Sequence, residues 1–223
     1  KKLCISTATV ALQEQLLNKD LPMFRQYSGL AFDFALVKGR GRYICVSKLE
    51  LAADTQASDQ SALWHKPPDK SDLQLVKKLW QAWLDKKWDG ERDSWPTSIS
   101  NTLWSHIQCD KFTCNKQLAA HAQCPFHKAR EIINKLDVLI VNHSLLLADL
   151  ELGGGKILPE PDSMFYIIDE AHHLPAKTRD FSSAMSSVQG SIDWLGKMDL
   201  MGKKISTTLK SQQLIGPIMK LSD

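Results

Sequence analysis

Short apolar runs that alternate with helical segments are the feature that most constrains the fold of this chain. Such runs occur at residues 3–6, 35–37, 138–141 and 164–168. Helical spacing of apolar residues lies between or beside them, at residues 10–17, 126–136 and 144–150. Short buried strands that alternate with helices form a parallel sheet with helices on both faces. The sequence therefore predicts an α/β fold.

The first helix has a start signal and a stop signal. Thr7 or Thr9 can cap its N-terminus, because a hydroxyl oxygen accepts a backbone N–H in the first turn. Pro22 is expected to end the helix, because proline lacks an N–H and clashes with the preceding turn.

Residues 43–130 differ in amino-acid composition from the segments on either side. They hold four of the five cysteines and six of the seven tryptophans, and two proline breaks interrupt them. Their clearest helix is expected at 71–87, where we expect Trp80 and Trp83 to pack in a small core instead of stacking on bases. We interpret 43–130 as an insertion that is partly helical and partly irregular. The fold then divides into residues 1–42, 43–130, 131–180 and a polar tail at 181–223.

Composition excludes several classes of protein. The chain of 223 residues carries 28 Lys and Arg against 25 Asp and Glu, so net charge alone does not indicate a nucleic-acid binder. No apolar stretch of about 18 residues is present to span a membrane. Five cysteines without a signal-peptide pattern favour a reducing compartment, the cytoplasm. Because Lys1-Lys2 leads directly into an apolar strand, we read the chain as a piece of a longer protein.

Two adjacent carboxylates, Asp169 and Glu170, follow the last apolar strand. Such residues lie at the carboxyl edge of a parallel sheet, where open α/β folds bind ligands. In a nucleotide triphosphatase, Asp169 would hold Mg²⁺ and Glu170 would orient and deprotonate the attacking water. His172 would connect this site to parts that move upon hydrolysis. The alternative is a surface turn with acidic residues at a helix N-terminus.

The cysteines divide into one and four. Cys4 lies on the first apolar strand and is expected to be a buried structural thiol. The others are candidate metal ligands: Cys45, Cys109, Cys114 and Cys124. Four thiolates suit a 4Fe-4S cluster or a structural zinc, and the absence of any Cys-x₂-Cys pair favours iron and sulfur.

A local basic run consists of Lys38, Arg40 and Arg42, separated by glycines. Glycines let backbone amides approach phosphates, and the cations supply salt-dependent affinity for nucleic acid. The alternative is a solvated turn.

Five blocks of sequence resemble, in the same order, motifs of the DinG-type branch of the XPD-like iron-sulfur helicases, which belong to superfamily 2. They lie at residues 6–13, 39–45, 87–93, 141–146 and 169–175. The last block contains the four-residue motif Asp169-Glu170-Ala171-His172, which is similar to the Walker B box of DEAH-type helicases. The resemblance fades after Arg179.

This resemblance implies a partial RecA-like motor domain interrupted by an iron-sulfur domain, with a helical arch beginning at residue 181. It implies ATP with Mg²⁺ and a 4Fe-4S cluster as the bound groups. The implied activity is a 5′-to-3′ DNA helicase of repair or replication, acting as a monomer on single-stranded, forked or R-loop DNA. Thr7, Thr9 and Gln13 match motif Ia positions that contact the single strand.

The sequence departs from the family pattern in two places. It has no Gly-Lys-Ser/Thr phosphate loop, since Gly155-Lys156 is followed by Ile157, so the chain alone is expected not to hydrolyse ATP. The third cluster ligand is also missing between Asn115 and Gln123. Either Cys109 substitutes, or His121 is the fourth ligand, or the site is degenerate. A different class of function is a non-catalytic nucleic-acid-binding module with a metal-stapled insertion and a vestigial Walker B.

Overall fold

The computed structural model describes residues 1–54 and 70–183, and isolated positions from 188 to 202. Residues 1–54 and 70–182 belong to one compact unit, which is the part described below. The predicted arch segment at 181–223 and Trp64 of the insertion lie almost wholly outside the described residues. Within the described part, no helix is both long enough and apolar enough to cross a membrane.

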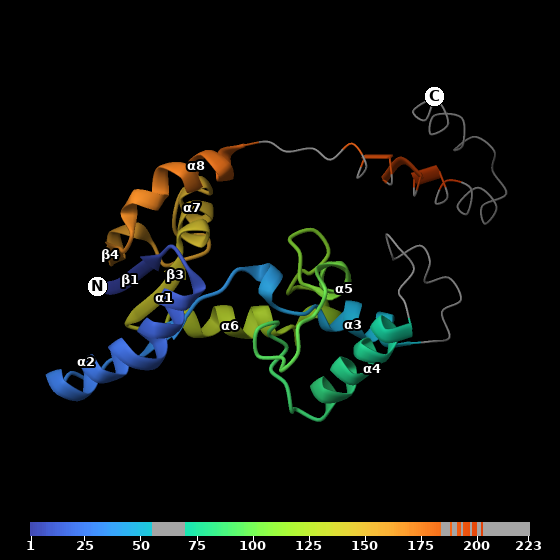
Figure 1. Ribbon diagram of the computed structural model, residues 1–223, viewed down its shortest axis with the longest axis horizontal. Helices are drawn as coiled ribbons and strands as arrows, with labels where there is room; N and C mark the ends of the chain where they lie inside the picture. Colours follow the sequence, from blue (N-terminus) through green and yellow to red (C-terminus); the bar gives the residue numbers. More distant parts are fainter. Residues whose placement is uncertain are drawn as a thin grey trace. The chain divides into compact units, whose positions relative to one another are not determined.

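Four strands and eight α-helices make up this unit (Figure 1). The strands are β1 (Lys2–Thr7), β2 (Phe34–Leu36), β3 (Val138–Asn142) and β4 (Met164–Ile168). The helices are α1 (Val10–Gln15), α2 (Leu21–Ser28), α3 (Val46–Ala53), α4 (Lys70–Leu84), α5 (Asn101–Ile107), α6 (Pro125–Ile133), α7 (His143–Glu151) and α8 (Leu174–Ser182).

The four strands form one parallel sheet in the order β2-β3-β1-β4. Strand β1 therefore lies in the centre, with Cys4 opposite Leu139 of β3 and Tyr166 of β4. Residues far apart in sequence meet in this sheet, because 101 residues separate the end of β2 from the start of β3 and more separate β1 from β3. The predicted α/β class with a parallel sheet is confirmed.

Apolar side chains cover both faces of the sheet centre. On one face Cys4, Leu139 and Val141 pack with Leu145 and Leu146 of α7. On the other face Ile5, Val138 and Ile140 pack with Leu21 and its neighbours. The edge strand β4 departs from the expectation of two covered faces, since Phe165 and Ile167 are 61% and 50% exposed.

In the first helical segment the predicted N-cap is confirmed and the predicted stop at Pro22 is wrong. Thr9 caps α1 as expected, with its Oγ1 accepting the Leu12 N–H at 3.3 Å. Pro22 does not end the helical path, because it occupies the first turn of α2 and the chain stays helical to Ser28. A π-helical turn, Leu16–Asp20, precedes it. Proline is tolerated in a first turn, where its missing N–H has no partner to lose, so Gly29 in the left-handed conformation ends the segment instead.

A buried carboxylate holds the loop that leads into β4. Asp149, fully buried on α7, accepts backbone N–H groups of four successive residues, at distances of 2.5 to 3.1 Å: Gly155, Lys156, Ile157 and Leu158. Arg130 of α6 grips the same loop by donating to the carbonyl oxygens of Ile157 and Lys156. The loop is therefore fixed from both sides.

Replacing Asp149 with Asn should lower the free energy of unfolding by about 3 kcal/mol, because a charged acceptor of several buried N–H groups is lost and an NH₂ group then faces N–H donors. Urea unfolding followed by circular dichroism measures this change. Asp162→Asn, an exposed acid on the same loop, is the matched control and should change stability by less than about 0.5 kcal/mol. Equal stability of the two variants would contradict the role of Asp149.

Candidate functional site

The adjacent carboxylates lie where the sequence placed them, at the carboxyl edge of the sheet. Strand β4 ends at Ile168, and the Asp169 N–H donates to the Ser6 carbonyl of β1 at 2.9 Å, which extends the ladder by one bond. Asp169 is half-buried and Glu170 is exposed. The main chain thus holds Asp169 while the Glu170 side chain remains accessible to a ligand at this edge.

Glu170 has an unusual backbone. Its φ of 53° is left-handed, a conformation that few residues other than glycine adopt and that is often found at functional sites. Its Oε2 lies 3.2 Å from Nδ1 of His172, and the rings of His172 and His173 are 4.1 Å apart. All three side chains are exposed. The turn after β4 therefore presents a carboxylate and two imidazoles to solvent.

A buried histidine next to this turn was missed by the sequence analysis. Asn142, within the family-like block at 141–146, caps α7, since its Oδ1 accepts the Leu145 N–H at 2.7 Å. The following residue, His143, is 1% exposed and its Nδ1 lies 2.8 Å from Ser6 Oγ. Burial lowers the pKa of His143, although the nearby backbone of Glu170 and Asp169 opposes that shift. Ser6 thus joins His143 to Asp169.

The inserted segment brings all four of its cysteines together. Cys45 and Cys124 are the N-cap residues of α3 and α6, Cys109 follows α5, and Cys114 lies in the next loop. All four are at most 2% exposed, and Tyr43 and Phe126 pack around them. None forms a disulfide. Cys4, in contrast, is buried in the sheet, where burial and then Asp149 raise its pKa to about 12.

A histidine joins the thiols. The Sγ atoms of Cys45, Cys114 and Cys124 and a ring nitrogen of His121 all lie within 4.8 Å of one another. His121 Nδ1 is 3.2 Å from Cys45 Sγ. Cys109 Sγ lies 3.5 Å from Cys114 Sγ and 2.9 Å from the Ile44 carbonyl oxygen. Five soft or borderline donors therefore converge, and both candidates for the fourth ligand, Cys109 and His121, are within reach.

The chemistry of these donors fits a metal centre. Hydrogen bonds from Cys109 and Cys45 lower the pKa of Cys124 to about 2, and its Sγ also accepts the Val46 N–H at 3.4 Å. Burial raises the pKa of Cys114 to about 12, while hydrogen bonds with Cys124 and Cys45 raise that of Cys109. These thiols are buried, form no disulfide and are hydrogen-bonded to one another. A metal ion or an iron-sulfur cluster that binds the sulfur atoms would displace their protons.

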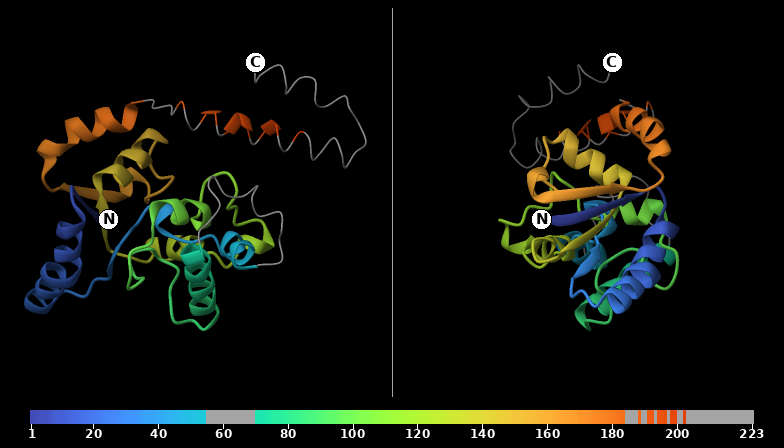
Figure 2. Two further views of the ribbon diagram at one scale, coloured as in Figure 1. Left: turned by 45° about the vertical axis from the view of Figure 1, so that its right-hand side comes forward. Right: turned by 90° about the vertical axis from the view of Figure 1, so that its left-hand side faces the viewer.

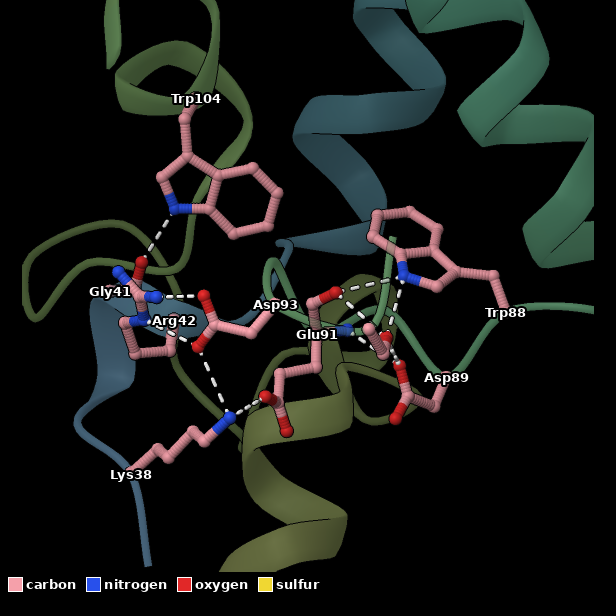
Figure 3. Close-up of polar contacts among 9 residues, drawn as sticks. Lys38, Gly41, Arg42, Trp88, Asp89, Glu91, Asp93 and Trp104 are labelled. Carbon is pink, nitrogen blue, oxygen red and sulfur yellow. Dashed lines mark hydrogen bonds and ion pairs between the residues drawn. The ribbon is translucent and has the colours of Figure 1, made fainter. Parts of the chain in front are cut away.

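The three cations of the predicted basic run have internal partners. Lys38 forms ion pairs with Glu91 and Asp93, and Arg42 clasps the same Asp93, with its Nε 3.1 Å from Oδ2 (Figure 3). Although burial opposes it, the interactions with Lys38 and Arg42 hold the pKa of Asp93 below its ordinary value. This network ties residues 38–42 to residues 88–94. Arg42 keeps 40% of its side chain exposed, so its contact with DNA stays a prediction.

Arg40 points into the cysteine region. Its Nη1 donates to the carbonyl oxygens of Asp110 and Cys114 at 3.1 and 3.0 Å, and its guanidinium lies 4.4 Å from the centroid of the Phe126 ring. The cation therefore braces the loop that carries two of the thiols. Sequence alone did not reveal this role, because the partners are about 70 residues away.

The motif Ia positions differ in accessibility. Thr7 and Gln13 are 0% and 5% exposed, and only Thr9 reaches the surface, where its Oγ1 already caps α1. In this conformation Thr9 alone of the three offers surface to a DNA backbone. Contact of these residues with DNA stays a prediction.

Comparison with known proteins shows similarity to DinG helicases over most of this chain. No protein-family model matches the chain. An ATP-dependent DNA helicase DinG from Photobacterium profundum is 56% identical over 199 residues, 89% of this chain and 29% of that protein. DinG helicases of Escherichia coli K12 and Salmonella typhimurium are each 34% identical over 94% of this chain and 30% of their own length. The predicted similarity is confirmed, and the chain spans less than a third of these relatives.

Proposed function

We propose that this chain, which matches part of the DinG helicases over most of its own length, is the segment of a 5′-to-3′ DNA helicase that runs from motif Ia to motif II. The observation that carries the proposal is the position of Asp169 and Glu170 at the carboxyl edge of the sheet, within the matched motif. Residues 1–42 and 131–180 then belong to the first motor domain, 43–130 to the inserted domain and 181–223 to the arch.

ATP hydrolysis in the longer protein would use the two carboxylates differently. Asp169, held by Ser6, coordinates Mg²⁺ of the bound nucleotide, and Glu170 accepts the proton of the attacking water. His172, 3.2 Å from Glu170, orients that carboxylate and transmits the change at the phosphate to neighbouring segments. These steps drive movement along single-stranded DNA.

The cysteine centre would hold a 4Fe-4S cluster. We assign Cys45, Cys109, Cys114 and Cys124 as its ligands, because all four thiols are buried in one apolar cluster with two aromatic rings. His121 is the alternative fourth ligand, since it lies among three of the thiols. When bound, the cluster cross-links three segments of the insertion and makes it a rigid wedge at a fork.

The partners would be single-stranded DNA and forked or R-loop DNA, engaged by a monomer in the cytoplasm. Thr9 is the exposed motif Ia residue that can reach the phosphate backbone. Arg42 is the partly exposed cation that can add a charged contact. Repair and replication supply the single strands on which such an enzyme acts.

A second candidate function is a non-catalytic nucleic-acid-binding module. The observation that favours it is the group of buried donors Cys45, Cys114, Cys124 and His121, which would brace residues 43–130 without any need for ATP. In that case the cysteine centre grips DNA and the carboxylates after β4 are vestigial.

A phosphate-release assay separates the two. The purified chain alone should show no DNA-stimulated release of phosphate from ATP, because backbone N–H groups that cradle the phosphates are missing. The longer protein that contains it should release phosphate when single-stranded DNA is added, and should separate a duplex with a 5′ tail. Turnover by the chain alone would contradict the first expectation. A longer protein that binds DNA without hydrolysing ATP would favour the second function.

A further inference from the structure

An open groove of about 990 Å³ crosses the inserted segment on the side of α4. Most of its lining residues come from α3, α4 and α6 and from residues 86–91, called the floor. Seven of its lining residues carry indole, ammonium or proline side chains: Trp80, Trp83, Trp88, Lys86, Lys87, Lys128 and Pro125. None of the residues described above as candidate ligands or catalytic groups lines this groove.

Two indoles on one face of α4 are only partly packed. Trp80 and Trp83 lie three residues apart and are half-buried, whereas Val76 and Leu79 of the same helix are fully buried. The core of α4 therefore rests on aliphatic residues. The predicted packing role of the two tryptophans is only partly correct, because each keeps surface open to the groove.

The third indole is fixed in place. Trp88 Nε1 donates to the Glu91 carbonyl at 2.8 Å and lies 3.0 Å from Ser94 Oγ (Figure 3), and its ring meets Trp95 edge-on at 5.3 Å. Gly90 next to it is left-handed, and a Cβ there would lie 2.9 Å from a side-chain carbon of Ile44. The floor of the groove is therefore held rigidly before any ligand arrives.

Lysines and acids both line the groove, and one lysine lies against an indole. Lys128 Nζ is 5.8 Å from the centroid of the Trp83 ring, and Lys86 follows α4, which ends at Leu84. Of the lining acids, Glu91 is neutralised by Lys38 and Asp89 accepts the Glu91 N–H at 2.9 Å. Glu50 is a further acid in the lining. Lys128 therefore stands beside an indole face, and Lys86 and the Asp85-paired Lys87 add two further ammonium groups to the lining.

We infer that this groove binds single-stranded DNA, with bases stacked on Trp80 and Trp83 and a phosphate at Lys128. Indole faces accept any base, and cations beside them neutralise the backbone, which is the usual chemistry of sequence-tolerant single-strand binding. The inference rests on the proposed function, because a helicase that separates a duplex produces the single-stranded DNA that the groove would bind. It adds a second DNA contact, separate from motif Ia.

The test measures binding of a fluorescently labelled oligo(dT) to the purified chain by anisotropy at several salt concentrations. Trp83→Ala should weaken binding about 10-fold through loss of base stacking. Trp83→Phe should recover most of that loss, and its recovery excludes misfolding as the cause. Lys128→Ala should weaken binding and reduce the slope of log affinity against log salt by about one. Lys135→Ala, which removes the same charge just beyond the end of α6, is the matched control and should bind as the unaltered chain does.

Each other outcome overturns the inference in a distinct way. If Trp83→Ala and Lys128→Ala bind like the unaltered chain, DNA binding lies elsewhere, and the helicase proposal stands. If the unaltered chain does not bind oligo(dT), the groove is no DNA site and is covered by another part of the longer protein. The helicase proposal is then decided separately by DNA-stimulated phosphate release from that longer protein.

Discussion

Replacing Glu170 with Gln in the longer protein should lower DNA-stimulated ATP turnover by about 100-fold or more, because an amide cannot accept the proton of the attacking water. Duplex unwinding should be lost with it. Nucleotide should still bind, since Asp169 keeps its carboxylate and its hydrogen bond to the Ser6 carbonyl. Steady-state phosphate release and equilibrium binding of a fluorescent ATP analogue measure the two quantities separately.

Glu151→Gln is the matched control for this substitution. Glu151 is an exposed acid at the end of α7, so the same loss of charge should leave turnover unchanged. A Glu170→Gln enzyme that unwinds DNA at the unaltered rate would remove Glu170 from the catalytic role. A variant that no longer binds nucleotide would instead assign to Glu170 a part in binding.

Anaerobically purified chain should contain iron and acid-labile sulfide, and serine at any one of the four clustered thiols should remove most of the iron. The physical reason is that a serine oxygen is a poor ligand for iron and leaves a buried hydroxyl among thiols. Iron and sulfide assays on the purified variants measure the loss. The variants are Cys45→Ser, Cys109→Ser, Cys114→Ser and Cys124→Ser.

Two controls locate the fourth ligand. Cys4→Ser changes a cysteine that is equally buried but lies in the sheet, so its iron content should stay unchanged. His121→Ala should also keep its iron if the four thiols are the ligands. Loss of iron in His121→Ala together with retention in Cys109→Ser would make His121 the ligand instead. Metal-free protein after anaerobic purification would contradict the cluster altogether.

The strands were predictable because their signal is local. Residues 138–141 and 164–168 form uninterrupted apolar runs, which indicate strands without other information, although only the first run is buried on both faces. The placement of Asp169 and Glu170 followed from the same pattern, since residues after a parallel strand emerge at the carboxyl edge. Pro22 was misread because its cost depends on which turn of a helix it occupies, and the preceding π-helical turn has no simple sequence signal.

The cations predicted to contact DNA show that a local sequence pattern does not reveal long-range ion pairs. Lys38 and Arg42 looked like free cations beside glycines, but their partners Glu91 and Asp93 lie about 50 residues further along the chain. Asp149 gave no signal, and His143 appeared only within the family-like block at 141–146. A buried polar residue is identifiable only once the groups that satisfy it are known. The partner of His143 lies on a distant strand, and the partners of Asp149 lie on the loop six to nine residues later.

The sequence by itself determined the class of fold and the site of the two carboxylates, because both follow from residues that are neighbours in the chain. The set of four cysteines and the similarity to DinG helicases were also predictable, because they depend on residue types and their order and not on contacts. Only the tertiary structure decided the strand order, the approach of His121 to the thiols and the clasp of Asp149 on the β4 loop. It also decided the internal pairing of the basic run and the open faces of Trp80 and Trp83. Most of these depend on contacts between segments far apart in the chain, which hydrophobic burial brings together. The contacts of Asp149 span only six to nine positions, but they depend on the fold of the loop that turns its N–H groups toward the carboxylate.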